Sequence, residues 1–476
     1  GLAAGDKVGL FADNRYEWIV SSMAITLCGA ADVPRGTDIT AEDIRHIVPH
    51  SDMKILLVED EATLRRVRSV GESSVLQTVV LLEGRSDKVL RFTDLLERGV
   101  ELLARGSHSV QSSLAGIRPE HLFTLIYTSG TTGQPKGVML SHGNLLSQIQ
   151  RIPIEISPVE RILSILPVWH IFERIFELIA ISKGCATYYT TVRTLKEDLA
   201  IVKPTFMASA PRLWESVYAG ILTAVARGSK IKRVLFSMAT GLASLYYSIK
   251  RSNRLWQKLA LPLLFLPYAL LDRLVLAKIR QATGGKLKGS VSGGGALPLH
   301  VDLFFNSIGI PVLEGYGMTE TSPVLAVRTM DRLIPGTVGP IYPDTELRLV
   351  DPQTKKVVWP GPEGIGKKGE IHVRGPQVMQ GYYKNPEATA AVIRDGWLNT
   401  GDLGLMTDDG CLRIVGRTKE TIVLLGGENV EPVPIENRLL QSPLIAQCMV
   451  VGQDQKYLGA LIVPEAEQFR EYGQDL

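Results

Sequence analysis

The stretch LFTLIYTSGTTGQPKGVMLSHGNLL, residues 122–146, joins an apolar run to a loop rich in hydroxyl groups and glycine. Residues 122–127 are apolar β-formers, which predicts a buried strand. Residues 128–137 hold four Ser or Thr, three Gly and Lys136. Glycine lets a backbone approach a ligand closely, and hydroxyl and N–H groups donate to phosphate oxygens. The loop is therefore predicted to cradle a polyphosphate.

The composition of this loop allows two alternatives. A plain hairpin loop is one, because Gly, Thr and Pro are common turn residues. Ten residues with this many donors and without an acidic residue are unusual for a turn. A P-loop is the other, but its G-x-x-x-x-G-K-[ST] spacing fails. Gly130 and Gly133 are three apart and Lys136 precedes Gly137, so the loop indicates a different ATP-using fold.

Length and composition predict a multi-domain globular protein. The chain has 476 residues, 45% of them hydrophobic and 21% charged, which is more than a single core needs. Four scattered cysteines (Cys28, Cys185, Cys411 and Cys448) form no C-x-x-C pair. This usage fits a reducing compartment and neither a disulfide framework nor a zinc site. The first residues lack the plan of a signal peptide, so we expect a cytoplasmic location.

The order of apolar runs predicts an α/β fold. The runs KILLVED, TVVLLEG, ILSILPV and TFMASAP alternate with longer amphipathic stretches, a pattern typical of parallel sheets covered by helices. From about Gly336 short strands with dense Gly and Pro predict an antiparallel β-rich subdomain over 336–416. A further boundary near Gly416 predicts a small α+β domain over 417–476.

Positive charge gathers in one segment, residues 217–289. It contains thirteen Lys or Arg and a single acidic residue, Asp272, for a net charge of +12, whereas the remainder carries −9. The segment also contains LALPLLFLPYALL, residues 259–271, which is too short to span a bilayer. A basic, apolar, helical insertion is typical of an element that binds an anionic membrane surface. A buried helix with a solvated basic face is an equal alternative.

Two later motifs place glycine and aromatic residues after predicted strands. VSGGGALP, residues 291–298, would let Gly293, Gly294 and Gly295 lie flat against a planar ligand, or would only make a tight turn. EGYGMTETSP, residues 314–323, sets Tyr316 beside Glu320. Tyr316 could stack on a purine or fill a core. Glu320 could ligate Mg²⁺ or begin a helix.

Two motifs nearer the C-terminus supply polar groups. NTGDLG, residues 399–404, offers Asp402, which could accept hydrogen bonds from both ribose hydroxyls or could be an ordinary turn residue. GRTKETIVLLGGENVEPVPIEN, residues 416–437, offers Arg417 for the sugar or α-phosphate and predicts a hairpin around Gly426 and Gly427. Each motif is weak alone, but the set in this order is specific.

Five stretches resemble, in order and spacing, the core motifs of the adenylate-forming superfamily. They are YTSGTTGQPKGV, VSGGGALP, GYGMTET, TGDLG and GRTKETIVLLGGENVEP. That superfamily contains acyl-CoA synthetases, adenylation domains and luciferases. LPVWHIFERIFEL, residues 166–178, and the basic insertion look like its long-chain fatty acyl-CoA synthetase branch. The resemblance covers nearly the whole chain and implies a large AMP-binding domain, 1–416, followed by a small lid domain, 417–476.

The resemblance implies roles for particular residues. The β- and γ-phosphates of ATP would lie in the loop of Thr128, Ser129, Gly130, Thr131, Thr132, Gly133 and Lys136. Adenine and the α-phosphate would contact Gly293, Gly294, Gly295, Tyr316, Gly317 and Thr319, and the ribose would contact Asp402 and Arg417. Glu320 would ligate Mg²⁺, and His170 would lie near the reacting carboxylate, although a capped surface histidine is the alternative. Lys419 would be the hinge, and Gly426 and Gly427 would line the pantetheine channel.

The implied function is ATP-dependent activation of a long-chain fatty acid to acyl-AMP, followed by transfer to coenzyme A with release of AMP and pyrophosphate. An acyl-acyl carrier protein synthetase, an acyl-AMP ligase and a non-catalytic nucleotide- or lipid-binding paralogue are the alternatives. Expected partners are the fatty acid, ATP, coenzyme A and an anionic membrane surface on the inner face, with no nucleic acid.

The chain also departs from the family pattern. Typical members have tens of residues before GDKVGLFADN and a longer segment after GALIVPE, so we expect a fold incomplete at both ends, without the late catalytic lysine of the small domain. Glu428 stands where short-chain members often carry arginine. VPRGTDIT, residues 33–40, replaces a more usual apolar run.

Overall fold

Apolar runs in the first third of the chain form one twisted sheet with the strand order β17-β7-β6-β2-β1-β3-β4-β5. The computed structural model describes residues 2–71, 76–86, 89–106, 109–128, 134–251, 255–442 and 444–466. Strands β1 to β6 pair in parallel, and β7 and β17 add to them in antiparallel fashion. The strands are β1 (Lys7–Phe11), β2 (Ala31–Arg35), β3 (Ile55–Val58), β4 (Thr78–Leu81), β5 (Leu90–Arg91), β6 (Leu122–Thr128), β7 (Lys136–Ser141) and β17 (Gly381–Tyr382). The helices are α1 (Tyr16–Leu27), α2 (Ala41–His50), α3 (Glu61–Ser69), α4 (Phe92–Ala104) and α5 (Ser109–Gly116).

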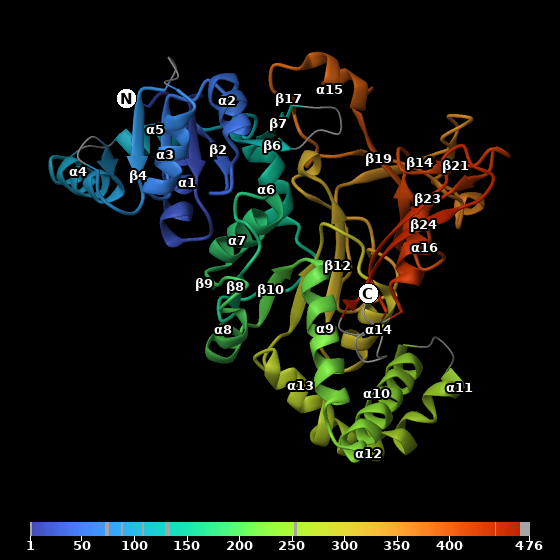
Figure 1. The fold of residues 1–476 in the computed structure, drawn as a ribbon. Helices are drawn as coiled ribbons and strands as arrows, with labels where there is room; N and C mark the ends of the chain where they lie inside the picture. Colours follow the sequence, from blue (N-terminus) through green and yellow to red (C-terminus); the bar gives the residue numbers. More distant parts are fainter. Residues whose placement is uncertain are drawn as a thin grey trace.

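A second sheet lies beside the first and has the order β13-β12-β11-β10-β8-β9 (Figure 1). Its strands pair in parallel except β13, which is antiparallel to β12. They are β8 (Arg161–Ser164), β9 (Ala186–Tyr189), β10 (Phe206–Ser209), β11 (Gly289–Ser292), β12 (Val312–Gly317) and β13 (Val324–Val327). The helices with it are α6 (His142–Gln150), α7 (Ile171–Lys183), α8 (Leu195–Val202) and α14 (Leu299–Ser307).

The most basic segment of the chain is helical and projects from the second sheet (Figure 1). It comprises α9 (Pro211–Ala226), α10 (Lys230–Arg251), α11 (Leu255–Lys258), α12 (Leu261–Leu271), a π-helical turn at Asp272–Leu276 and α13 (Ala277–Ala282). Trp214 of α9 packs edge-on against Phe305 of α14, with ring centroids 4.7 Å apart. Tyr246 stacks on Tyr268, with centroids 4.5 Å apart, and this contact joins α10 to α12. Among the described residues of α12, none is buried.

The region after Gly336 is antiparallel, as its short strands predict. Its sheet has the order β15-β14-β16-β19-β18, with β20 paired to β19. The strands are β14 (Glu346–Val350), β15 (Val357–Trp359), β16 (Gly369–Arg374), β18 (Ile393–Arg394), β19 (Trp397–Met406) and β20 (Leu412–Arg417), with the helix α15 (Pro386–Val392) and a 3₁₀ turn at Pro362–Gly364. Its inward residues, such as Leu349 and Ile371, join the core that β6, α7 and the second sheet share.

The small terminal domain mixes both element types. It contains β21 (Ile422–Val423), β22 (Asn429–Val430), α16 (Pro432–Leu439), β23 (Ile445–Val451) and β24 (Gly459–Pro464). The predicted α/β class, with a β-rich part and a small α+β domain, is thus confirmed, while the predicted limits at 336, 416 and 417 stay predictions. Among the helices of the described ranges, none is both long and apolar enough to cross a membrane.

Candidate active site

The β6–β7 hairpin holds the two ends of the loop predicted to bind phosphate. Residues 122–128 form the predicted strand, and its interior is buried, as expected for a strand between packed layers. Thr128 lies opposite Lys136 in the register of the hairpin. Ser129, Gly130, Thr131, Thr132 and Gly133 lie outside the described residues. The phosphate role of this loop therefore stays a prediction.

Lys136 lies at one end of a short chain of contacts that leads to Glu320. Strand β17 adds to the edge of β7 and brings Tyr382 opposite Val138. The Lys136 ammonium lies 5.3 Å from the centre of the Tyr382 ring, within cation–π range. The Tyr382 hydroxyl donates to Glu320 Oε1 at 2.8 Å. The sequence motifs place Lys136 and Glu320 far apart, and Tyr382 is the residue that connects them.

Glu320 belongs to a 3₁₀ turn at Thr319–Thr321, directly after Thr319. Its side chain is buried, and its backbone carbonyl accepts the Met379 N–H at 2.8 Å. The Glu320 carboxylate thus contacts Tyr382, and the residue itself lies in a short helical turn. A carboxylate fixed in this way has the chemistry of a ligand for a hard divalent cation.

Tyr316, Asp402 and Arg417 meet at a second polar cluster. They come from β12, β19 and β20, and Asp402 and Arg417 are register partners. The Tyr316 hydroxyl donates to Asp402 Oδ2 at 2.6 Å, and Arg417 Nε donates to Asp402 Oδ1 at 3.0 Å. Burial raises the pKa of Asp402, while both donors counteract that effect. The three residues predicted to bind the nucleoside are therefore brought together.

The predicted glycine turns have different physical reasons. A Cβ on Gly293 would lie 3.2 Å from the Phe172 ring, and Gly294 has a φ of +80°, which favours glycine. Gly295 follows, near Pro211. A Cβ on Gly317 would lie 1.8 Å from the Pro323 carbonyl oxygen, so only glycine fits there. The close contacts at Gly293 and Gly317 are with the protein itself, as the tight-turn alternative also expects, so contact of these glycines with a planar ligand stays a prediction.

His170 begins α7, and its exposed ring stacks on Trp169 with centroids 4.5 Å apart. Crowding by protein and the positive charge of Arg35 lower the pKa of His170, while Asp38 opposes them. The loop before it is held by Asn14, which donates to Leu166 O at 2.7 Å and accepts the Val168 N–H at 2.8 Å. The role of His170 near the reacting carboxylate stays a prediction.

A small, mostly apolar cavity of about 30 Å³ lies between α7 and the second sheet. Its lining comes partly from α7, through Phe172, Ile175 and Ile179. The second sheet contributes Val291, Val324 and Val327. Its wall includes the Phe172 ring that packs against Gly293. An extended apolar group could reach it only after these side chains move apart.

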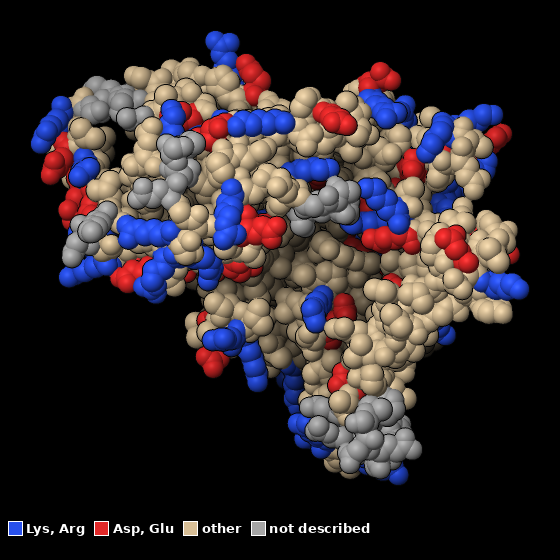
Figure 2. All heavy atoms as spheres, turned by 45° about the horizontal axis from the view of Figure 1, so that its top comes forward, with Lys and Arg blue, Asp and Glu red and all other residues tan. Residues whose placement is uncertain are grey.

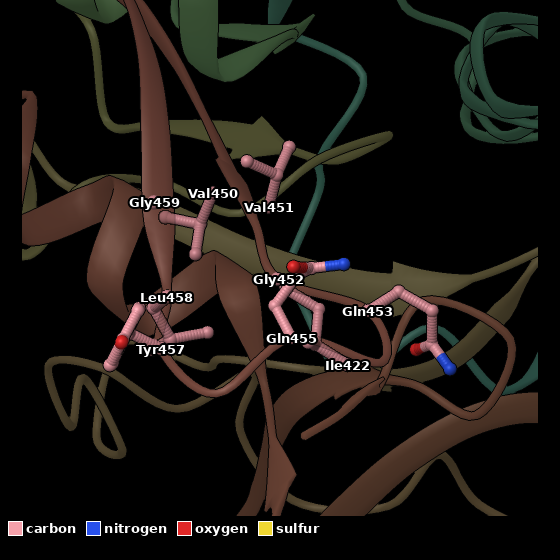
Figure 3. A pocket seen from close by; sticks show the side chains of 9 residues that line it. All are labelled: Ile422, Val450, Val451, Gly452, Gln453, Gln455, Tyr457, Leu458 and Gly459. Carbon is pink, nitrogen blue, oxygen red and sulfur yellow. The ribbon is translucent and has the colours of Figure 1, made fainter. Parts of the chain in front are cut away.

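The small domain contains the predicted hinge and hairpin. Lys419 is exposed in the turn between β20 and β21. Gly426 and Gly427 lie in the turn that joins β21 to β22, where Gly427 has a φ of +83°. A cavity of about 630 Å³ lies beside this hairpin, between Ile422, Val450 of β23 and Leu458 (Figure 3). None of the predicted site residues lines it, so it gives no support to the pantetheine channel.

Sequence motifs missed two residues that organise the site. Tyr382 lies in the stretch GYYKN, whose paired aromatics after a glycine were a usable signal. Asn14 ends the stretch FADN after β1, and a polar residue at the carboxyl end of a parallel strand is a general indication of a site.

Comparison with known proteins identifies the family of the chain. The family model for the AMP-binding enzyme matches residues 1–383, and that for the AMP-binding enzyme C-terminal domain matches residues 419–475. Probable acyl-activating enzyme 16, chloroplastic, of Arabidopsis thaliana is 38% identical over 98% of this chain and 70% of its own length. Long-chain-fatty-acid–[acyl-carrier-protein] ligase AEE15, chloroplastic, of Arabidopsis thaliana is 35% identical with the same coverage.

A bacterial relative and a solved structure extend the comparison. Long-chain-fatty-acid–CoA ligase FadD15 of Mycobacterium tuberculosis is 34% identical over 100% of this chain and 75% of its own length. The crystal structure of the anthranilate CoA ligase AuaEII with anthranoyl-AMP has a TM-score of 0.71 at 22% identity, over 99% of this chain and 80% of that one. That likeness concerns the fold. The chain belongs to the AMP-binding enzyme family, the adenylate-forming enzymes.

Proposed function

We propose that this adenylate-forming enzyme activates a long-chain fatty acid with ATP to acyl-AMP and transfers the acyl group to coenzyme A. The observation that carries the proposal is that Tyr316, Asp402 and Arg417 come together in one polar cluster, while Tyr382 joins Lys136 to Glu320 in another. The Tyr316–Asp402–Arg417 cluster suits a nucleoside. The Lys136–Tyr382–Glu320 chain of contacts suits phosphates, and the apolar side chains around the small cavity on α7 could take a hydrocarbon chain once they move apart.

The chemistry needs these groups because an anion must attack an anion. A fatty carboxylate approaches the α-phosphorus of ATP, and pyrophosphate leaves. Lys136 would offset the negative charge of the leaving phosphates, as oriented cations do in such transition states. Thr319, next to Glu320, would contact the α-phosphate. Asp402 would accept the ribose hydroxyls and so fix the α-phosphorus relative to His170.

Glu320 fits a Mg²⁺ site of the kind found with nucleotides, in which one protein carboxylate is joined by substrate phosphate oxygens. The Tyr382 hydroxyl holds Glu320 Oε1 and so fixes the direction of the carboxylate. Bound there, Mg²⁺ would neutralise phosphate charge during the attack. Within the described residues, no group of three or more possible metal ligands exists that would suit a metal held by protein alone.

The second half-reaction needs a thiol to reach the acyl-AMP. We propose that the small domain turns about Lys419 and brings the Gly426–Gly427 hairpin to the pantetheine chain. Coenzyme A is the acceptor we favour, in keeping with the name of the mycobacterial relative. Acyl carrier protein is the alternative, because one plant relative carries that acceptor in its name.

A competition assay decides the acceptor and the substrate class. The protein, expressed from its complete coding sequence, is given ATP, Mg²⁺ and acids from acetate to arachidate, with coenzyme A and holo-acyl carrier protein present together. The proposal expects acyl-CoA from the long acids and much less from the short ones. Acylated carrier protein as the main product would assign the alternative activity. Nucleotide binding without any turnover would assign a non-catalytic paralogue.

We also propose that α12 docks on an anionic membrane surface. Leu263, Leu266 and Leu270 of α12 are 81%, 77% and 60% exposed, and their spacing puts them on one helical face. Leu259, in the turn before the helix, is 78% exposed. Lys and Arg side chains lie along one side and at the tip of this projecting lobe (Figure 2). The exposed leucines favour a membrane element over the buried-helix alternative, and the net charge of +12 favours anionic lipids.

Vesicle flotation tests this docking. The protein should float with phosphatidylglycerol vesicles more than with phosphatidylcholine vesicles, and binding should fall as salt rises. The double variant Leu263→Glu, Leu266→Glu should lose most of the binding, while Val192→Glu, at a residue 85% exposed elsewhere, should keep it. Equal binding to both lipids, or a double variant that binds like wild type, would contradict the proposal.

A further inference from the structure

Arg35 is the residue at which the sequence departs most clearly from the usual apolar run, and it lies between two parts of the candidate site. It ends β2, at the carboxyl edge of the first sheet, where α/β folds usually bind ligands. Its guanidinium is mostly buried, with about a fifth of the side chain exposed (19%). Burying a cation at this edge costs free energy unless its neighbours pair with it.

The guanidinium contacts three neighbours at once. Its Nη1 donates to the carbonyl oxygen of Tyr127 at 3.2 Å, one residue before Thr128. Its Nη2 donates to Asp43 of α2 at 3.1 Å. Its central carbon lies 5.8 Å from the centre of the Trp169 ring, and that ring stacks on His170. Arg35 therefore joins the end of β6 to the Trp169–His170 pair.

The neighbouring residue makes the same junction tight. A Cβ on Gly36 would lie 2.5 Å from Trp169 Nε1, so the backbone after Arg35 packs directly against the indole. Trp169 is thus confined by Gly36 and by the guanidinium. The planar, forked shape of arginine suits this combination of a carbonyl, a carboxylate and an aromatic face, whereas lysine offers a single point charge.

We propose that Arg35 is a positioning residue of the adenylation site, which fixes the strand end leading into the phosphate-binding loop relative to the Trp169–His170 pair. The inference rests on the proposed function, because it assigns these two parts to ATP and to the reacting carboxylate. It adds a residue that the family motifs in this sequence do not include.

Charge supports the same assignment. Arg35 lowers the pKa of His170, after the larger effect of desolvation, and Asp38 acts in the opposite direction. On α7 itself, Arg174 is paired with buried Asp32, and burial raises the pKa of Glu173 well above its ordinary value. Removing the charge of Arg35 should therefore raise the pKa of His170, and keeping the charge with lysine should not.

Three variants test the proposal. Arg35→Met removes both the fork and the charge, Arg35→Lys keeps the charge, and Arg45→Met is the control on exposed α2 surface. We expect Arg35→Met to lower kcat of fatty-acid-dependent ATP–pyrophosphate exchange by about tenfold or more with KM for ATP changed much less, because misplaced groups chiefly lose rate. Arg35→Lys should lose part of that rate, and Arg45→Met none of it.

An NMR titration of the histidine ring signals, assigned with His170→Gln, gives a readout that needs no turnover. The pKa of His170 should rise in Arg35→Met and stay near its wild-type value in Arg35→Lys. Wild-type kcat in both Arg35 variants, or a His170 pKa that is the same in all variants, would overturn the proposal. Should Arg35→Met fail to fold, the kcat of Arg35→Lys decides, and a wild-type rate overturns it. Absence of exchange in the wild type would count against the proposed function, and the titration would still test Arg35.

Discussion

Replacing Asp402 by Asn should reduce the use of ATP because this carboxylate is proposed to hold the ribose. Its two oxygens already accept from the Tyr316 hydroxyl and from Arg417, and each oxygen retains a further lone pair. The side chain is buried, so water competes poorly. Hydrogen bonds to a charged group contribute about 1.5–3 kcal/mol each. Since 1.4 kcal/mol is about tenfold, the variant should lose about tenfold to a hundredfold in kcat/KM for ATP.

Nucleotide analogues separate a ribose contact from general damage. Wild type should prefer ATP over 2′,3′-dideoxy-ATP, and Asp402→Asn should lose most of that preference because the hydroxyls no longer meet a carboxylate. Asp408→Asn, at an exposed turn close in sequence, is the matched control and should keep it. Melting temperatures show whether each variant is folded.

Low pH should also weaken the use of ATP, through protonation of Asp402. Burial raises the pKa of Asp402, and the protonated form accepts hydrogen bonds less well than the carboxylate. The use of ATP by wild type should therefore weaken as pH falls through that pKa, and Asp402→Asn should lack this limb of the profile. An Asn variant with unchanged discrimination between ATP and the dideoxy analogue would refute the ribose assignment.

Three further predictions concern the phosphate loop, one glycine and one buried acid. Lys136→Ala should lower kcat/KM for ATP by about a hundredfold with little change in fatty-acid binding, and a wild-type value for ATP would exclude the phosphate role. Gly317→Ala should fail to fold, since its Cβ would lie 1.8 Å from a carbonyl oxygen, whereas Gly426→Ala, with open space around it, should melt like wild type; equal melting would contradict the packing argument. Burial raises the pKa of Glu177 to about 7 from an ordinary value of 4.5, so the folded state holds this proton more tightly and stability falls as pH rises from 4.5 to 7, by up to about 3 kcal/mol. Glu177→Gln should reduce that slope in urea unfolding, and the remainder should come from buried Glu173 and Glu314, whose pKa values are also raised. An unchanged slope would show that Glu177 does not contribute.

Strands and layers could be predicted because the local pattern determines them. The apolar runs of β3, β4, β8 and β10 are short, rich in β-formers and bounded by turn residues, and the structure pairs them in parallel. The short strands with dense Gly and Pro after Gly336 likewise predicted the antiparallel sheet. The helical character of the basic insertion was predicted. The sequence left open whether its apolar residues are buried or exposed, because that depends on how the helices pack against the rest of the chain.

Contacts within the site were less predictable because they join distant segments. Asp402 and Arg417 were each assigned to the ribose, but their pairing depends on the register of β19 with β20. Tyr382 reaches Glu320 only because β17 adds to the edge of β7. Arg35 departs from the family pattern in the sequence. Its contacts with Tyr127 and Trp169 could not be predicted because they depend on how the first and second sheets lie beside one another.

The central claim, that a fatty carboxylate attacks ATP to form acyl-AMP, is tested most directly by isotope exchange between pyrophosphate and ATP. The protein, expressed from its complete coding sequence, is incubated with ATP, Mg²⁺ and labelled pyrophosphate, with and without palmitate and without coenzyme A. The account predicts that label enters ATP only when palmitate is present, and that palmitoyl-AMP accumulates until a thiol is added. Exchange that does not depend on palmitate, or release of ADP instead of AMP, would contradict it.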